Sequence, residues 1–273
     1  MKTPVTISLI TALVIGVGIG SFQLGAGNLD SRALMSKNLL KEQAMREVEV
    51  SIWETANAIF SYLTEPQESA LEEYRLQLED VEAFLAEFEA LVETEVEKNR
   101  MVQFRSMWRG VRIKAENLIR LRDGLTRVQE EAWDRVQEIE DILTYQIQLA
   151  LATVEIGRRE KNRAIKEIQV GAWEALTAVS VLVDRRFDKA ERVFSDQVKG
   201  VEEKWAQYKK TPLNQAEFSH LEEFDEAWSE AVNAMGETFA YAGALRQNIR
   251  EFWGSVHVGD DFIDFEIQIN LNK

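Results

Sequence analysis

Apolar residues recur along most of the chain at alternating steps of three and four positions, which is the spacing of one face of an α-helix. Long stretches rich in Glu, Ala, Leu, Lys, Arg and Gln run between only three prolines. The pattern predicts an all-α protein whose amphipathic helices each bury one apolar stripe against their neighbours. The clearest stripes are Leu71, Tyr74, Leu78, Val81, Leu85 and Phe88; Phe104, Trp108, Val111, Ala115, Leu118 and Leu125; and Val128, Ala132, Val136, Ile139 and Leu143.

The helical pattern occurs twice, with an offset of 120 residues. Residues 47–60 read EVEVSIWETANAIF, and residues 167–180 read EIQVGAWEALTAVS. Self-similarity at a fixed offset predicts repeated architecture. We therefore expect an N-terminal segment over residues 1–28, a first repeat unit over 29–157 and a second repeat unit over 158–273. The offset pairs Trp53 with Trp173, Phe104 with Phe224, Trp108 with Trp228, Trp133 with Trp253 and Asp141 with Asp261.

Short motifs place some of the helix ends. Pro66 ends the first helix, because proline has no amide donor and restricts the residue before it. Thr94, with Glu97 three residues later, is a capping-box start for a third helix. In the second unit, Thr211 as the cap and Pro212 as the first helical residue predict a further start.

Gly124 and Gly157 decide how many helices each unit holds. The apolar stripe crosses Gly124 nearly in phase, and an isolated glycine in a helix costs only about 1 kcal/mol. We therefore expect one helix of about 60 residues, roughly 90 Å long, which starts near Thr94 and ends at a turn before the polar run RREKNR. A break at Gly124, with four helices per unit, is the alternative. With a continuous helix through Gly124, the chain has six helices, in the order short, short and long in each unit. This order predicts two four-helix bundles stacked end to end.

The N-terminal segment has a different character from the rest of the chain. Residues 5–27 carry no charge, and about 20 such residues cross the hydrocarbon core of a bilayer. Lys2 precedes this run and a large acidic region follows it. The charge bias predicts a transmembrane helix that is a single-pass anchor in the inner (cytoplasmic) membrane, with the bulk of the protein on the periplasmic or extracellular side. A cleaved signal peptide is the alternative.

Composition and charge exclude several classes of function. The formal net charge of −15 argues against a nucleic-acid partner, which needs a concentrated basic face. The chain has no cysteine for disulfides or thiolate metal sites. Residues 217–220 read EFSH, but di-iron bundles need the Glu-x-x-His spacing twice. We therefore expect no metal and no cofactor. The sequence has no nucleophile and base at a recognisable spacing, so we do not expect an enzyme.

Arginines and tryptophans supply the candidate binding residues. Arg122 occupies a position where the stripe requires an apolar side chain, and its counterpart in the second unit is Ala242. A guanidinium in a bundle interior needs a carboxylate, from the protein or from a ligand, and a protein carboxylate is the favoured reading. Arg105 and Arg109 flank Trp108 and, with Arg112, form either an anion pocket or a solvated edge of the stripe. The matched tryptophans fill bundle layers, with stacking on a ligand as the alternative.

Together these residues resemble a known family. The helix EVSIWETANAIFSYLTEPQESALEEY, the acidic stripe LEDVEAFLAEF and the helix ends IEDILTYQIQ and DDFIDFEIQI, after an apolar N-terminal run, are similar to the helical bimodular sensor domains of bacterial chemoreceptors and sensor histidine kinases. The resemblance implies a periplasmic homodimer that binds small ligands, organic acids or amino acids, in one or both bundles. Binding would displace a helix and pass the signal through the membrane.

One departure from the family supports another hypothesis. Members of the family continue into a second membrane helix and a signalling region, and this sequence ends at INLNK. The alternative function is a membrane-anchored or secreted structural subunit. Such a subunit would assemble with copies of itself or dock on a larger complex.

Overall fold

The computed structural model describes residues 29–152, 157–180 and 187–264, and every regular element in these ranges is a helix. The six longest helices follow the predicted order of short, short and long, twice over, although the first is longer than expected. The two long helices span 47 and 42 residues. In chain order the elements are α1 (Leu29–Thr64), α2 (Glu68–Leu91), α3 (Glu95–Asp141), the π-helical η1 (Ile142–Ile147), α4 (Gln148–Leu151), α5 (Arg158–Ser180), α6 (Phe187–Lys209), α7 (Gln215–Ser219) and α8 (Leu221–Phe262).

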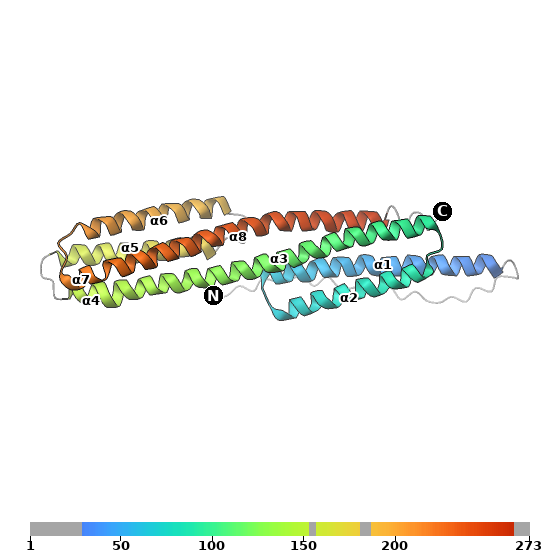
Figure 1. The fold of residues 1–273 in the computed structure, drawn as a ribbon, viewed down its shortest axis with the longest axis horizontal. Helices are drawn as coiled ribbons and strands as arrows, with labels where there is room; N and C mark the ends of the chain where they lie inside the picture. The colour runs from blue at the N-terminus through green and yellow to red at the C-terminus, as the bar shows by residue number, and fades with distance from the viewer. Residues whose placement is uncertain (1–28, 153–156, 181–186, 265–273) are drawn as a thin grey trace, which may run out of the picture.

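The two long helices, α3 and α8, lie side by side along most of an elongated molecule, and α1 extends beyond them at one end (Figure 1). Three contacts show that they are antiparallel and in one register. Along α3 from Asn117 through Gly124 to Arg135, the partners on α8 run backward from 248 through 241 to 230. The middle of this register falls near Arg122 on α3 and Ala242 on α8. We call this region the waist.

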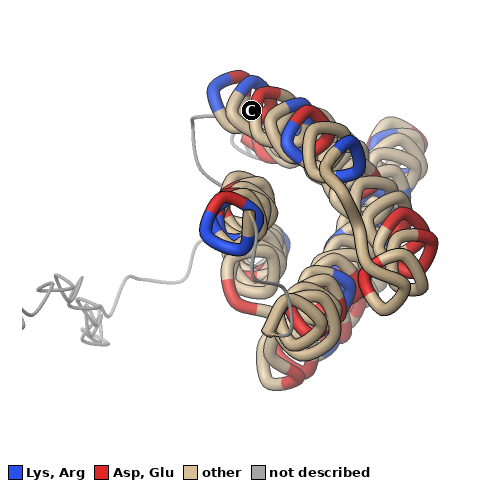
Figure 2. The backbone as a smooth tube through the Cα atoms, turned by 90° about the vertical axis from the view of Figure 1, so that its left-hand side faces the viewer, with Lys and Arg blue, Asp and Glu red and all other residues tan. Residues whose placement is uncertain are grey.

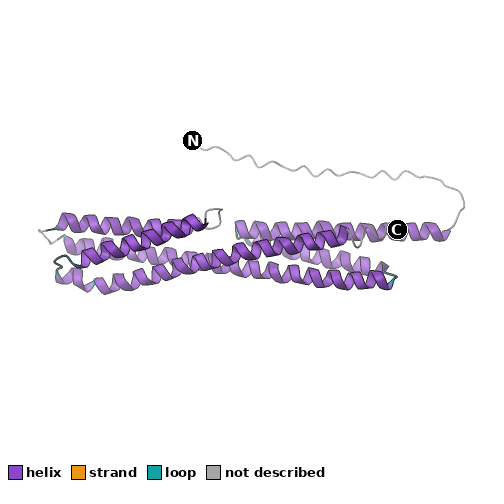
Figure 3. Ribbon diagram, turned by 90° about the horizontal axis from the view of Figure 1, so that it is seen from above, coloured by secondary structure: helices purple, strands orange, loops and turns teal. Residues whose placement is uncertain are grey.

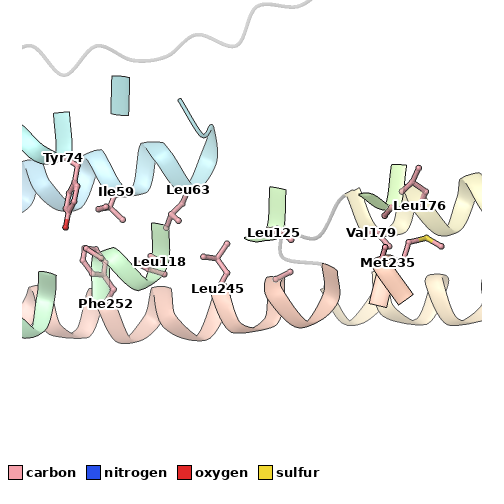
Figure 4. Close-up of a cluster of buried hydrophobic side chains, with 14 of the residues drawn as sticks. Ile59, Leu63, Tyr74, Leu118, Leu125, Leu176, Val179, Met235, Leu245 and Phe252 are labelled. Atoms are coloured by element: carbon pink, nitrogen blue, oxygen red, sulfur yellow. The ribbon is translucent and has the colours of Figure 1, made fainter. Parts of the chain in front are cut away.

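The shorter helices form two antiparallel hairpins, α1 with α2 and α5 with α6. The first hairpin lies beside one half of the α3–α8 pair, and the second lies beside the other half (Figures 1 and 3). The core continues across the waist, where Leu63 lies over Leu118 and Leu245 on one side and Val179 lies near Met235 on the other (Figure 4). All five side chains are buried. The apolar stripes predicted from the sequence are therefore the surfaces that join each hairpin to the long pair.

Two tryptophan contacts repeat with the 120-residue offset, and each crosses from one unit to the other. The indole of Trp53 on α1 donates from Nε1 to Asp260 Oδ1 on α8, at 2.9 Å. The indole of Trp173 on α5 donates to Glu140 Oε2 on α3, at 3.0 Å. Residues 173 and 260 are the counterparts of residues 53 and 140. The molecule therefore has a pseudo-two-fold axis through the waist, which exchanges α3 with α8.

A buried ion pair fastens the outer end of each unit. Lys41 on α1 bonds Glu97, at 2.6 Å, and its counterpart Lys161 bonds Glu217, at 2.7 Å. Both lysine side chains are 4% exposed. Burial alone would raise the pKa of Glu97, but bonds from Lys41 and from two backbone amides lower it to about 2. Each glutamate also closes a capping box, so the first pair joins α1 to the start of α3 and the second joins α5 to the start of α7.

The capping boxes confirm one predicted helix start and correct another. Thr94 caps α3 with Glu97, as predicted. In the second unit the cap is Asn214 with Glu217, not Thr211 followed by Pro212. Thr211 instead donates its hydroxyl to the carbonyl of Tyr208, at 2.7 Å, at the end of α6. Asn214 is the counterpart of Thr94 at the 120-residue offset, so the two capping residues occupy the same position in their units.

Both glycine predictions are confirmed. Gly124 lies inside α3, and the helix continues through it. Gly157 has a φ of 75° and lies directly before α5, where the sequence predicted a turn. Gly124 also has a packing role, because an added Cβ would lie 2.3 Å from Cε1 of Tyr241 on α8. Absence of a side chain at this position allows α3 and α8 to approach closely near the waist.

The predicted localisation requires a correction. In the ranges that the structure describes, no helix is long and apolar enough to cross a membrane. The predicted transmembrane segment at residues 5–27 lies outside those ranges. A single-pass anchor in the inner membrane, with the bulk of the chain on the periplasmic side, is therefore not supported.

The close approach at Gly124 gives a stability prediction. Gly124→Ala should lower the free energy of unfolding by about 1–3 kcal/mol, because overpacking at Tyr241 outweighs the better helix propensity of alanine. Gly110→Ala is the matched control on the same helix, since nothing lies within 4 Å of its added Cβ. This control should raise stability by about 0.5–1 kcal/mol. Urea unfolding measures both, and equal stabilisation by the two substitutions would contradict the close approach.

Candidate ligand site between α2 and α3

Arg105 is held by carboxylates of the protein. Its Nε donates to Glu89 Oε1 at 2.5 Å, and its Nη1 donates to Glu82 Oε2 at 2.8 Å. The bond from Arg105 lowers the pKa of Glu89, and the two carboxylates raise the pKa of Arg105. The guanidinium of Arg105 therefore joins α3 to α2 and has little capacity left for a ligand.

Arg109 and Trp108 lie in opposite environments. Arg109 is exposed, and no hydrogen bond or ion pair joins it to the part of the chain that the structure describes. Trp108 is 3% exposed, and its indole N–H is buried without an acceptor among the described residues. The reading of Trp108 as a core residue agrees with its burial. By contrast Trp133, which was expected in the core, is 49% exposed and stacks edge-on against Trp173, with ring centroids 5.0 Å apart.

Arg122 lies at the waist, and its partners are neutral. Its Nε donates to the carbonyl of Leu63 at 3.0 Å, and its Nη1 donates to Thr126 Oγ1 at 3.1 Å. The favoured expectation of a carboxylate bonded to Arg122 was therefore wrong. Burial lowers the pKa of Arg122, and the nearby Tyr62 and Asp123 oppose that effect. Arg122 satisfies a carbonyl in the last turn of α1 and thereby fastens α1 to α3.

A group of buried polar atoms without partners lies between α2 and α3 of the first unit. Tyr74 and Gln77 come from α2, and Trp108 and Arg112 come from α3, in each case about one turn apart. The atoms are the Tyr74 hydroxyl, Gln77 Oε1, Trp108 Nε1 and Arg112 Nε, and none has a hydrogen-bond partner among the described residues. We call these four residues the α2–α3 polar site.

Contacts of Arg112 connect the two helices near the α2–α3 polar site. Arg112 Nη1 lies 3.4 Å from Glu82 Oε1, which links α3 to α2 beside the site. Burial raises the pKa of Tyr74 to about 12; the nearby Glu116 adds to the shift, and Arg112 opposes it. The hydroxyl of Tyr74 therefore remains protonated at any physiological pH and is available as a donor.

The second unit provides an internal comparison for this site. The counterparts of Tyr74 and Arg112 are Phe194 and Val232. Phe194 packs against Phe239, with ring centroids 5.1 Å apart, so the corresponding space is filled by aromatic rings. Trp228 keeps the unpaired indole N–H of Trp108. The hydroxyl and the guanidinium are therefore features of the first unit alone.

The chemistry of the α2–α3 polar site suits an acceptor-rich ligand. Three of its unpaired atoms carry N–H or O–H donors, from Trp108, Arg112 and Tyr74, and one, Gln77 Oε1, is an acceptor. A buried donor or acceptor without a partner costs roughly 1–3 kcal/mol. A carboxylate can accept from each of these donors, and an amino or hydroxyl group can donate to Gln77.

Sequence reasoning missed Tyr74 and Gln77. Tyr74 was counted as an apolar member of its stripe, because only its hydroxyl distinguishes it from phenylalanine. The signal that would have found it is the alignment of the two units, in which a tyrosine and an arginine of one copy replace a phenylalanine and a valine of the other. Arg112 was predicted beside Arg105 and Arg109, but as a flank of Trp108 rather than a partner of α2.

The motif EFSH is explained by contacts within the protein. Glu217 accepts from Lys161 and from the hydroxyl of Tyr208, at 2.7 and 2.6 Å. His220 Nδ1 lies 3.0 Å from Glu223 Oε2. Within the described ranges, no group of three or more His, Asp or Glu side chains is arranged to hold a metal ion.

The comparisons with known proteins leave the chain without an assigned family. No protein-family model matches it, and no curated protein matches its sequence. The resemblance to helical bimodular sensor domains therefore enters below only as part of a proposal.

Two buried tyrosines give opposite predictions. Tyr74→Phe should raise the free energy of unfolding of the ligand-free protein by about 1 kcal/mol, because the substitution removes an unpaired buried hydroxyl. Tyr208→Phe is the matched control, since its hydroxyl donates to Glu217; it should lower stability by about 1.5–3 kcal/mol. Both are measured by urea unfolding. A similar loss of stability in both variants would mean that the Tyr74 hydroxyl already has a partner.

Proposed function

We propose that this chain is a ligand-sensing domain that binds a small anionic molecule, of the organic-acid or amino-acid class, at the α2–α3 polar site. One observation carries the proposal: three buried donors without acceptors lie on α2 and α3 of the first unit, while the second unit has aromatic and aliphatic side chains in place of two of them. A stabilising role would favour the apolar version in both units. A binding role accounts for the difference, because the unpaired donors gain their partner only with the ligand.

The proposed architecture is that of two four-helix bundles stacked end to end, which share α3 and α8. The α1–α2 hairpin would complete the first bundle, and the α5–α6 hairpin would complete the second. This arrangement is similar to that of the helical bimodular sensor domains. The two antiparallel long helices and the crossed contacts of Trp53 and Trp173 support it.

The signal in this proposal is a displacement of α3 relative to α2. A ligand at the α2–α3 polar site would favour one spacing of the two helices over another. Because α3 continues through the waist, the shift would reach the second unit along one rigid helix. Arg122 ties α1 to α3, and Tyr241 of α8 lies over Gly124, so both neighbours of α3 would move with it.

A thermal-unfolding screen tests the proposal. Organic acids and amino acids are added singly at millimolar concentration, and the midpoint of unfolding is recorded. A ligand present at about 100 times its Kd should raise the midpoint by about 5 °C. Arg112→Met should abolish the shift, whereas Arg109→Met, which removes an exposed arginine from the same helix, should retain it. A midpoint unmoved by every compound, or equal effects of the two substitutions, would contradict the proposal.

A further inference from the structure

The pseudo-two-fold axis relates two aromatic clusters that lie on the long helices. In the first cluster, Trp253 of α8 packs against Trp53 of α1, with ring centroids 6.1 Å apart. In the second cluster, Trp133 of α3 packs against Trp173 of α5, with ring centroids 5.0 Å apart. Trp133 and Trp253 are counterparts at the 120-residue offset, and so are Trp173 and Trp53. The two clusters can therefore be compared position by position.

The clusters differ by one aromatic ring. Phe60, two turns after Trp53 on α1, adds its ring to the first cluster, with its centroid 6.5 Å from that of Trp253. The counterpart of Phe60 in the second unit is Ser180. The hydroxyl of Ser180 donates to the carbonyl of Leu176, at 3.0 Å, so this short side chain is turned back onto its own helix. A serine therefore stands in the second unit where the first unit has a phenylalanine ring.

A cavity lies beside Ser180, where that ring would be. Its volume is about 350 Å³, which is within the range of small-molecule sites. Trp133 of α3 lines it, and so do Leu176, Val179 and Ser180 of α5. We call it the α3–α5 cavity. Trp133 is 49% exposed, so the cavity has room for an aromatic ring beside an indole that is already accessible.

The rim of the α3–α5 cavity is acidic. Figure 2 looks along the molecule from the α5–α6 end and shows both signs of charge on the helices. The described lining of this cavity instead contains two carboxylates, Glu130 and Asp134, and no basic residue. Neither carboxylate forms an ion pair with a residue in the described ranges. Their counterparts in the first unit are Arg250 and Gly254, so the acidic rim belongs to the second unit alone.

We propose that the α3–α5 cavity binds an arylalkylamine, a small molecule that carries an aromatic ring and a protonated amino group. The ring takes the place that Phe60 takes in the first unit and packs against Trp133. The ammonium group lies at the rim, where Glu130 and Asp134 attract it. Both carboxylates are exposed, so the charge contributes less to affinity than the burial of the ring.

This inference goes beyond the proposed function and does not depend on it. The α3–α5 cavity is in the second unit and takes a cation, whereas the α2–α3 polar site is in the first unit and takes an anion. A ligand in the cavity contacts α3 and α5 together. It would therefore add a contact between the α5–α6 hairpin and the long pair.

Isothermal titration calorimetry of the full chain with phenethylamine tests the proposal. Wild type should bind this probe with a Kd of about 1 mM or lower. n-Butylamine, which has the charge without the ring, should bind at least tenfold more weakly. 2-Phenylethanol, which has the ring without the charge, should bind about threefold to tenfold more weakly, because exposed carboxylates contribute modestly.

Substitutions at Ser180 provide the sharpest comparison. Ser180→Phe supplies the cavity with the ring that the first unit already has, and it should raise the Kd for phenethylamine at least tenfold. Ser180→Ala is the matched control, because it removes the hydroxyl and leaves the cavity open; its Kd should stay within about twofold of wild type. Trp133→Ala, at an exposed position, should raise the Kd at least fivefold and tests the same cavity if Ser180→Phe does not fold.

Two further variants separate the charge from the ring and this cavity from the other site. Glu130→Gln/Asp134→Asn should raise the Kd for phenethylamine about threefold to tenfold and leave that for 2-phenylethanol unchanged. Arg112→Met, which alters the α2–α3 polar site, should leave phenethylamine binding unchanged. Failure of the anion screen and failure of amine binding are therefore independent results.

Three results would overturn the inference. The first is a wild-type protein that binds no phenethylamine at concentrations up to about 10 mM. The second is a folded Ser180→Phe variant, or a Trp133→Ala variant, that binds the probe as tightly as wild type. The third is equal affinity for n-butylamine and phenethylamine, because the acidic rim alone would then attract the amine and the cavity would hold no ring.

Discussion

The antiparallel pairing of α3 and α8 is the constraint on which the rest of the structure depends. These two helices extend through both units, and each hairpin packs against them. The register of α3 and α8 determines where the hairpins lie. It leaves one half of the long pair open to the α1–α2 hairpin and the other half open to the α5–α6 hairpin. The register itself depends on close contact near the waist, where Gly124 leaves room for the ring of Tyr241. The hydrogen bond of Asn117 with Asn248 and the crossed contacts of Trp53 and Trp173 fix the same relation between the two units.

The duplication separates what the fold requires from what one unit has acquired. Contacts present in both units are structural: the buried pairs of Lys41 with Glu97 and Lys161 with Glu217 hold the outer ends. A contact can also persist with its charges exchanged, because Arg105 with Glu89 in the first unit becomes Asp225 with Lys209 in the second. Positions that differ without such compensation point to function. The α2–α3 polar site is of this kind.

Much of the fold follows from the sequence because the determining signals are local and periodic. The helices and their order were predicted from the stripe with three- and four-residue steps, the capping box at Thr94 and the in-phase passage through Gly124. The expected length of about 60 residues was too long, since α3 and α8 span 47 and 42 residues. Contacts between residues of different helices were harder to predict. Nothing near Arg122 in the sequence indicates that its partner is a carbonyl at the end of α1, and the exposure of Trp133 depends on how α5 sits on α3. The α2–α3 polar site was found only in part, since an unpaired hydroxyl is a property of the packed bundle.

The most direct test of this account is a crosslink within the long pair. The chain has no cysteine, so two can be introduced without background, and the side chains of Asn117 and Asn248 are joined by a hydrogen bond of 2.7 Å. Asn117→Cys/Asn248→Cys should crosslink rapidly within one molecule through a short thiol reagent. Asn117→Cys/Ser255→Cys places the second thiol two turns away, about 10 Å along α8, and should crosslink far more slowly. Equal rates for the two pairs, or crosslinks only between molecules, would show that α3 and α8 do not share the register described above.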